Sequence, residues 1–257
     1  MNFVIGDIGN TKTKICLAED KNFKIKKLIY FDSKKIHSSK FLKKTLRKII
    51  SKNIHKTALF SSVVPKYKSL LGQFLNKIYQ INIKEIKEKK IKKIIKIDIK
   101  KKNQVGSDRI ANAVGAYKKY KCNCIVLDFG TATTFDVITK KGSYKGGIIA
   151  PGINLSLKSL VNSADQIPFF LLKKQKKVIG KNTLEALRSG FYWGYLGLIN
   201  NIITKIEKET RSKYKIIFTG GYANLFKSSM NRSFSIDKNI TINGIIEIFK
   251  KNRKSLF

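Results

Sequence analysis

The sequence is poor in acidic residues, proline, cysteine and histidine. Its 257 residues include only 16 Asp and Glu against 54 Lys and Arg, with three prolines, three cysteines and two histidines. Three cysteines cannot build a disulfide framework, and such a small number is typical of the reducing cytoplasm. Cys122-x-Cys124 has no second Cys pair or His cluster to complete a zinc site. We therefore expect neither a disulfide-stabilised secreted domain nor a cysteine metal centre.

Long hydrophobic runs are also missing. No run of 18 apolar residues occurs, so we expect no membrane-spanning helix. The first residues carry Asp7, Lys12 and Lys14, which does not fit a signal peptide. The hydrophobic fraction of 42% is ordinary for a globular protein, and the length allows one large or two medium domains. These features favour a cytoplasmic globular protein that does not bind a membrane.

The net charge of +38 raises the question of nucleic-acid binding. The basic residues are almost all Lys, whereas Arg is the more usual reader of base edges. They are spread over the whole chain, and in the densest run, residues 83–102, Ile recurs as on one buried face. This run is predicted to be a solvated amphipathic element rather than a polyanion-binding surface. We expect salt-sensitive, nonspecific binding at most.

Two short segments, one in each half of the chain, repeat the same pattern. Residues 3–18 and 124–136 each contain an apolar run that ends in Asp, then any residue, Gly and a small polar residue. The apolar runs predict buried strands, and each Gly lets the turn tighten and a ligand approach the backbone. Two such turns facing each other would supply carboxylates for a cation, and amides and hydroxyls for phosphate oxygens. The repeat predicts a duplicated fold that binds a nucleotide between its halves.

The order of the predicted elements supports this duplication. Each half is predicted to contain three strands, a helix, a strand and a helix. In the first half these are strands at 3–6, 14–18 and 27–31, a helix at 39–52, a strand at 57–61 and a helix at 66–78. After a helix at 110–120, the second half has strands at 124–128, 133–138 and 143–150, helices at 153–162 and about 183–210, a strand at 214–218 and a helix from Ala223. A last helix is predicted at 245–250.

Six motifs in a fixed order resemble those of one kinase family. They are Asp7-x-Gly9-Asn10-Thr11, Ser62-Val63-Val64-Pro65, Gly106-x-Asp108-Arg109, Asp128-x-Gly130-Thr131, Gly146-Gly147-x-x-x-Pro151-Gly152 and Thr219-Gly220-Gly221. At these spacings the chain resembles the type III pantothenate kinases, of the superfamily of actin, sugar kinases and heat-shock chaperone ATPases. The resemblance implies an α/β fold of two ribonuclease H-like (actin-like ATPase) domains, each a mixed sheet flanked by helices, with the active site in the interdomain cleft. We place the domains at residues 1–112 and 113–257.

The resemblance implies that both halves bind ATP. The loop at 7–13 would hold the phosphates through backbone amides, hydroxyls and lysine charge. The loop at 128–134 would carry Asp128, the ligand of a monovalent cation (K⁺ or NH₄⁺), and the turn at 219–221 would pack against adenosine. Mg²⁺ would accompany ATP. The expected ATP-binding residues are Asp7, Ile8, Gly9, Asn10, Thr11, Lys12, Thr13, Lys14, Thr131, Gly220 and Gly221. By itself Gly9-Asn10 would equally suit an ordinary hairpin turn.

The resemblance also implies the substrate site. Asp108 would be the general base for the primary hydroxyl of pantothenate, and Arg109 would pair with the pantothenate carboxylate. Gly106, Ser107 and Thr183 would complete the binding residues. Asp108 and Thr183 also stand where helix N-caps are expected, and Ser107 could take the cap in place of Asp108.

The implied activity is transfer of the ATP γ-phosphate to pantothenate, giving 4′-phosphopantothenate in the first step toward coenzyme A. A homodimer is implied, because relatives complete the pantothenate site at a dimer interface. Relatives often carry Tyr seven residues before the Gly of Gly-x-Asp-Arg, where this chain has Ile99, and the Asn-Pro expected after it is missing from residues 100–104. This departure favours, as an alternative, a kinase of another small hydroxyl compound. A non-catalytic transcriptional accessory or nucleic-acid-binding protein is the other alternative, suggested by the net charge.

Overall fold

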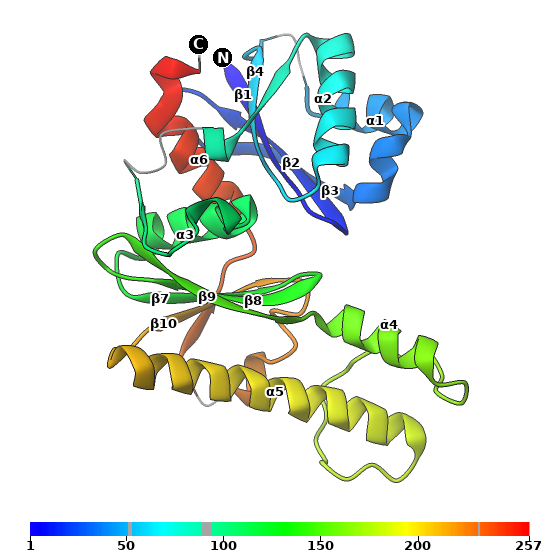
Figure 1. Ribbon diagram of the computed structural model, residues 1–257. Coiled ribbons are helices and arrows are strands. Elements are labelled where there is room, and N and C mark those ends of the chain that lie inside the picture. Colours follow the sequence, from blue (N-terminus) through cyan, green and yellow to red (C-terminus); the bar gives the residue numbers. More distant parts are fainter. Residues whose placement is uncertain (51–52, 89–93, 231, 257) are drawn as a thin grey trace. The chain divides into compact units, whose positions relative to one another are not determined.

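The chain folds into two compact units. The computed structural model describes residues 1–50, 53–88, 94–230 and 232–256 (Figure 1). The first unit comprises Met1–Lys121, Lys141–Lys145 and Asn239–Phe257, and the second comprises Cys122–Lys140 and Gly146–Lys238. The sequence predicts a division between residues 112 and 113, a point that lies inside helix α3 (Ser107–Tyr120). The last segment of the chain also returns to the first unit, so that unit is discontinuous in sequence.

The first unit is built on a five-stranded sheet of order β3-β2-β1-β4-β5. Strands β1, β2 and β3 form an antiparallel meander, and β4 and β5 continue the sheet parallel to β1. The bounds are β1 (Asn2–Ile8), β2 (Lys12–Glu19), β3 (Ile25–Asp32), β4 (Thr57–Ser62) and β5 (Asn82–Glu85). Because β1, β4 and β5 are parallel, their carboxyl ends meet at one edge of the sheet, where open α/β sheets carry their ligands.

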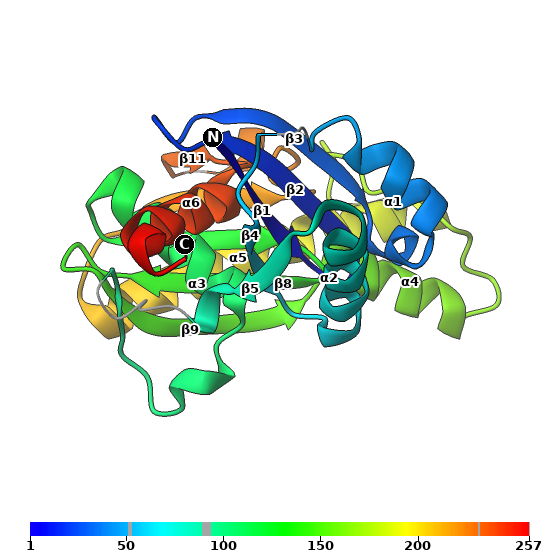
Figure 2. The ribbon, with the colours of Figure 1, turned by 90° about the horizontal axis from the view of Figure 1, so that it is seen from above.

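Helices cover both faces of this sheet (Figures 1 and 2). On one face, α1 (Ser39–Leu46) and α2 (Pro65–Tyr79) pack with the 3₁₀ helix η1 (Ser33–His37) on a core that includes Val4, Ile15 and Phe60. On the other face lie α3 and α6 (Ile240–Asn252). There the rings of Phe3 on β1 and Phe249 on α6 stack with centroids 3.8 Å apart. Apolar side chains on both faces of β1 explain its nearly continuous hydrophobic run.

Helices α3 and α6 cross at unusually close range. A Cβ atom on Gly244 would lie 1.8 Å from the carbonyl oxygen of Ala111, and one on Gly115 would lie 2.3 Å from that of Ile240. Only glycine allows two helix backbones to come this near. The buried hydroxyl of Thr241 donates to Asn112 Oδ1 at 2.7 Å next to this crossing. The crossing therefore depends on two positions with no side chain.

The second unit contains a sheet of order β11-β10-β7-β8-β9. Its bounds are β7 (Cys124–Phe129), β8 (Ala132–Ile138), β9 (Ser143–Pro151), β10 (Lys215–Gly220) and β11 (Phe234–Ile236). The first residues of β9, which belong to the first unit, pair with β6 (Lys96–Ile97). Helices α4 (Ile153–Ser163) and α5 (Thr183–Thr210) bury their apolar side chains against β7, β8 and β10, around Phe129, Tyr192 and Phe226. Asn182 caps α5, since its side chain accepts from the Glu185 N–H at 2.9 Å.

Most predicted elements are confirmed, and three predictions are wrong. The helix expected from Ala223 does not form; Leu225 N–H and Ser229 N–H instead donate three residues back, giving turns and a short 3₁₀ helix, while Phe226 packs on Phe129. The helix expected at 39–52 ends at Leu46, and residues 51–52 of that expectation lie outside the described chain. The run 83–102 is not one amphipathic element: its described part holds the end of β5, a 3₁₀ turn and β6, and residues 89–93 are outside the description. Strands β5, β6 and β11 were not predicted.

Among the described helices, none combines the length and apolar character needed to cross a bilayer.

Candidate functional site in two halves

The first half of the candidate site is the loop between β1 and β2. The Gly9 N–H donates to the carbonyl of Lys12 at 3.1 Å, which closes a tight turn over Asn10 and Thr11. Asn10, Thr11 and Lys12 are exposed, Lys14 is half-buried, and Ile8 is fully buried. Thr13 is 0% exposed and its hydroxyl is hydrogen-bonded to Ser33 at 2.9 Å. The loop therefore offers amides, the Thr11 hydroxyl and two ammonium groups, while Thr13 supports the loop from beneath.

Ser33, which the sequence does not single out, holds this loop in place. Its hydroxyl donates to the Gly9 carbonyl at 2.7 Å and bonds Thr13, and its N–H donates to the Thr11 carbonyl at 2.9 Å. Ser33 is fully buried at the start of η1, next to the end of β3. Ser33 thus makes three hydrogen bonds to this loop, and no short sequence pattern links residue 33 to residues 9–13.

Because the resemblance implies that this loop binds the phosphates of ATP, we expect Ser33→Ala to weaken nucleotide binding. The change leaves the Gly9 carbonyl and the Thr13 hydroxyl buried without this partner, which typically costs about 1–3 kcal/mol. KM for ATP should rise roughly tenfold while KM for the phosphate acceptor stays within about twofold, as measured by steady-state kinetics. Ser255→Ala, which removes an intrahelical hydroxyl far along the chain, is the control. Equal changes in both KM values would contradict a role specific to the loop.

The motif Gly106-Ser107-Asp108-Arg109 is fastened to the end of β4. The Ser107 hydroxyl donates to the Ser62 carbonyl at 2.8 Å and accepts from the Ser62 N–H at 3.0 Å. The expectation that Ser107 caps α3 is therefore wrong: the N-cap position is Gly106, and the Ser107 hydroxyl is used for this cross-link. Residues 62–65 and 106–109, separated in sequence, thus form one assembly at the carboxyl edge of the sheet.

Glycine at position 106 leaves room for the Asp108 carboxylate. A Cβ atom there would lie 2.4 Å from Asp108 Oδ1, which accepts the Arg109 N–H at 2.8 Å. Asp108 and Arg109 are both half-buried in the first turn of α3. The carboxylate thus folds back over the turn, and the helix N-terminus favours its negative charge. The motif Gly-x-Asp-Arg therefore needs glycine at its first position, because a side chain there would clash with the Asp108 carboxylate.

Asp7 and Asp128 occupy equivalent places in the two units. In the first, Asp7 pairs in register with Ser61 on the parallel strand β4. In the second, Asp128 pairs with Thr219 on the parallel strand β10 and with Thr134 on β8. Paired residues project from the same face of a sheet. Within the described chain the buried Oγ atoms of Ser61 and Thr219 have no hydrogen-bond partner. Each aspartate therefore lies beside a buried hydroxyl that can still form hydrogen bonds.

The turns of the second unit pack closely around Asp128. Gly220 has φ +84°, and a Cβ there would lie 2.7 Å from Asp128 Oδ1. The Gly221 N–H donates to the Phe129 carbonyl at 3.0 Å. A Cβ on Gly152 would lie 2.1 Å from the carbonyl oxygen of Thr131. Gly220 and Gly152 thus let the backbone pack against Asp128 and Thr131 where any side chain would clash.

Thr183 is the first residue of α5 and is exposed. The cap belongs to Asn182, and the Lys181 N–H donates to Glu185 Oε2 at 2.9 Å, so the Thr183 hydroxyl is not needed for capping. Gly106, Ser107, Asp108, Arg109 and the loop at 7–14 lie in the first unit; Thr183, Asp128, Thr131, Gly220 and Gly221 lie in the second. No group of three or more His, Cys, Asp or Glu side chains able to hold a metal occurs among the residues described.

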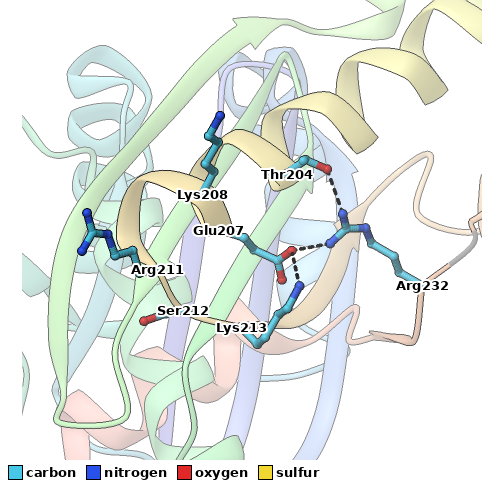
Figure 3. A pocket seen from close by; sticks show the side chains of 7 residues that line it. All are labelled: Thr204, Glu207, Lys208, Arg211, Ser212, Lys213 and Arg232. Atoms are coloured by element: carbon cyan, nitrogen blue, oxygen red, sulfur yellow. Dashed lines mark hydrogen bonds and ion pairs between the residues drawn. The ribbon is translucent and has the colours of Figure 1, made fainter.

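A cavity of about 320 Å³ in the second unit is lined by none of these residues (Figure 3). Glu207 is bound there by Arg232 at 2.6 Å and Lys213 at 3.4 Å, and Arg232 also donates to Thr204. Burial raises the pKa of Glu207, but the hydrogen bond and charge of Arg232, with Lys213, outweigh it and hold the pKa below its usual value. The cavity adjoins the amino end of β10, whereas Gly220 is at its carboxyl end. We interpret it as a structural ion-pair site joining residue 232 to α5.

Comparison with known proteins identifies the family of the chain. A family model described as type III pantothenate kinase matches residues 3–205. The type III pantothenate kinase of Pelagibacter ubique is 50% identical over 245 residues, covering 95% of this chain and 96% of that protein. The type III pantothenate kinase of Hyphomonas neptunium is 34% identical over 254 residues, covering 96% and 98%. A crystal structure from Campylobacter jejuni, described as a Baf family transcriptional activator, superposes with a TM-score of 0.63 at 21% identity and covers 98% of this chain and 99% of that one, which supports the fold.

Proposed function

The chain belongs to the type III pantothenate kinase family and is an ATP-dependent pantothenate kinase, and we propose here how its residues carry out that reaction. The enzyme transfers the γ-phosphate of ATP to the primary hydroxyl of pantothenate and forms 4′-phosphopantothenate, the first step of coenzyme A synthesis. Its fold is mixed α/β with two sheets flanked by helices. The observation that carries the assignment of roles is the Asp108 carboxylate held over the glycine turn at the start of α3.

Asp108 is the general base of the proposed mechanism. It accepts the proton of the pantothenate hydroxyl as that oxygen attacks the γ-phosphorus in line with the departing ADP oxygen. It lies in the first turn of α3, where the helix N-terminus interacts favourably with a negative charge. Arg109 binds the pantothenate carboxylate, since a guanidinium can form two parallel hydrogen bonds to it. Gly106 and Ser107 shape the turn, and Thr183 contributes a hydroxyl to the substrate.

The phosphates of ATP are assigned to the loop at residues 7–14. Backbone amides of the turn, the Thr11 hydroxyl and the ammonium groups of Lys12 and Lys14 balance the phosphate charge. Asp7 would contact the Mg²⁺ that arrives with ATP, because Mg²⁺ is bound by one or two carboxylates plus substrate phosphates. In the second unit, Thr131 contacts ATP, and Gly220 and Gly221 present bare backbone to adenosine. Thr13 acts through Ser33 rather than on the phosphates directly.

A monovalent cation, K⁺ or NH₄⁺, is assigned to Asp128. The donor set fits: a carboxylate flanked in register by Thr134 and by Thr219, whose buried Oγ has no partner among the described residues. Oxygen donors of this kind suit a hard cation. When bound, the cation would add positive charge near the phosphates. Asp128 and the two threonine hydroxyls would hold it.

We expect Thr219→Val to reduce cation binding, because it removes one oxygen donor at nearly constant volume. Wild-type protein should unfold at a higher temperature in KCl than in tetramethylammonium chloride of equal ionic strength, since a ligand that binds the folded state raises stability. The valine variant should lose most of that difference, and Thr219→Ser should keep it. Thermal unfolding measures this without any turnover. An unchanged K⁺ effect in Thr219→Val would exclude Thr219 from the site.

We also propose a homodimer that works in the cytoplasm. The second unit exposes Phe169, Leu171, Val178 and Ile179, each at least 63% exposed, within residues 164–182 before α5. Apolar groups of this size, gathered in one segment, are typical of an association surface. ATP and pantothenate are both cytoplasmic metabolites. Sedimentation equilibrium tests the dimer: Phe169→Glu should yield a monomer, and a wild-type monomer at micromolar concentration would contradict the proposal.

Coupled ADP release tests the assignment as a whole. ATP, Mg²⁺ and K⁺ are supplied with and without pantothenate, and the phosphorylated product is identified by mass. Turnover that requires pantothenate is expected. Turnover with another alcohol but not with pantothenate would show that the half-buried Ile99 has changed the acceptor. No turnover by folded protein with both cations present would contradict the catalytic roles.

A further inference from the structure

A buried hydroxyl, that of Ser61, lies at the carboxyl edge of the first sheet without a part in the mechanism above. Ser61 is the next-to-last residue of β4 and is 0% exposed. Within the described chain its Oγ has no hydrogen-bond partner. A buried hydroxyl without a partner destabilises a fold, and native structures contain few of them. The packing of the first unit alone therefore gives no reason for a hydroxyl at this position.

Strand register makes Asp7 a direct neighbour of Ser61. The two residues pair on the parallel strands β1 and β4, and neighbouring strands of a sheet lie about 4.8 Å apart. Ile8 and Phe60, which follow and precede them in sequence, belong to the core under α1 and α2. Because side chains alternate between the faces of a sheet, Asp7 and Ser61 both project from the other face, which α3 and α6 cover.

The second unit repeats this arrangement. Asp128 on β7 pairs with Thr219 on the parallel strand β10. The Thr219 hydroxyl is also buried, and no residue of the described chain is bonded to it. Both aspartates are assigned above to cations, Asp7 to Mg²⁺ and Asp128 to a monovalent ion. An unpaired hydroxyl beside each of them points to the cation sites rather than to the packing of either core.

We propose that Ser61 is a positioning residue: its hydroxyl donates to the Asp7 carboxylate when Asp7 binds the Mg²⁺ that arrives with ATP. Because Ser61 does not reach the surface, it acts through its neighbour and not on ATP itself. A carboxylate has two oxygens, so one can accept from Ser61 while the other stays available to the cation. A hydrogen bond to an ionised acceptor is also stronger than one between neutral groups. This inference rests on the proposed role of Asp7.

Ser61→Ala should affect stability and magnesium binding differently. Loss of an unpaired buried hydroxyl should leave the melting temperature unchanged or raise it. Wild type should bind a fluorescent ATP analogue more tightly with Mg²⁺ than with EDTA, at equal K⁺ concentration and ionic strength. The variant should lose about tenfold of this Mg²⁺ gain, the scale of a hydrogen bond to a charged group, and should bind like wild type in EDTA. Ser61→Thr, which keeps the hydroxyl and matches Thr219, should retain the gain.

Tyr79→Phe is the matched control. The Tyr79 hydroxyl is likewise buried, with no partner in the part of the chain that the structure describes. Tyr79 is the last residue of α2, ahead of the amino end of β5 and so away from the edge that carries Asp7. Its removal should preserve or raise the melting temperature in the same way and leave the Mg²⁺ gain unchanged. Asp7→Asn should lose most of the gain, and adding Ser61→Ala to it should change the gain by less than about twofold, because both changes act on one contact.

These variants separate the inference from the function on which it rests. A Mg²⁺ gain that survives in Asp7→Asn would contradict the proposed role of Asp7 and overturn the inference with it. A gain lost in Asp7→Asn but unchanged in Ser61→Ala would overturn the role of Ser61 alone. Equal losses in Ser61→Ala and Tyr79→Phe would show a general effect of changing buried hydroxyls and would overturn that role as well.

Discussion

Asp108→Asn should lower kcat by at least about 100-fold, the scale expected when a general base is lost. The amide has nearly the same size and can still accept the Arg109 N–H, so the turn at the start of α3 stays in place. It cannot take the proton from the acceptor hydroxyl. KM for ATP should change little, because the phosphate loop belongs to β1 and β2. Coupled ADP release at saturating pantothenate, with Mg²⁺ and K⁺ present, measures the effect.

Two controls make this result specific to Asp108. Glu209→Gln changes an exposed carboxylate on α5 in the second unit and should leave kcat within about twofold, as surface changes usually do. Binding of a fluorescent ATP analogue should be the same in wild type and Asp108→Asn. Activity of Asp108→Asn within about tenfold of wild type would remove Asp108 from the role of base, and positioning by the loop and Arg109 would then account for most of the rate.

Gly244→Ala should cost about 3 kcal/mol of unfolding free energy, at the upper end of overpacking effects. A methyl group at this position would lie 1.8 Å from the carbonyl oxygen of Ala111, which belongs to a helix backbone and cannot rotate away. Helices α3 and α6 must therefore separate along their whole contact. For a chain of this length the melting temperature should fall by roughly 6–12 °C. Thermal unfolding followed by circular dichroism measures the shift.

The matched control is Gly194→Ala in α5. Gly194 is also inside a long helix, but a Cβ there would have no atom within 4 Å. Alanine favours a helix over glycine by up to about 1 kcal/mol, so this variant should be equally stable or slightly more stable than wild type. A similar loss from both substitutions would mean that helix propensity, and not the close crossing, determines the response at Gly244.

Helices and strands were predictable where the residues that determine them are close together in the sequence. The hairpin β1–β2 follows from an apolar run, a Gly-Asn turn and a second apolar run, and α5 follows from its length and from the cap at Asn182. Short strands such as β11 carry too few residues to show a period, and they form only because a neighbouring strand is already in place. The helix expected after Gly221 fails because Phe226 is drawn into the core beside Phe129 and Tyr192, a long-range contact.

In the candidate site, too, only the residues that belong to a local sequence pattern could be predicted. The motif residues were recognisable because each has a fixed neighbour in sequence, such as Gly106 beside Asp108. Ser33 was not predicted because it bonds residues that are far away in the sequence, Gly9 and Thr13. Thr219 belongs to a recognised motif whereas Ser61 does not, and only strand register puts them beside Asp128 and Asp7.

The return of α6 to the first unit has a consequence for how the protein is made. Synthesis proceeds from the amino end at about 5–20 residues per second, and domains generally fold as they emerge. Here the face of β1 that carries Phe3 is covered only after Phe249 has been synthesised, almost the whole length of the chain later. The second unit, whose segments are all complete by Lys238, leaves the ribosome before the first unit can close. A nascent chain stalled at residue 238 should therefore bind chaperones through that uncovered sheet face, and release should follow translation of the last helix.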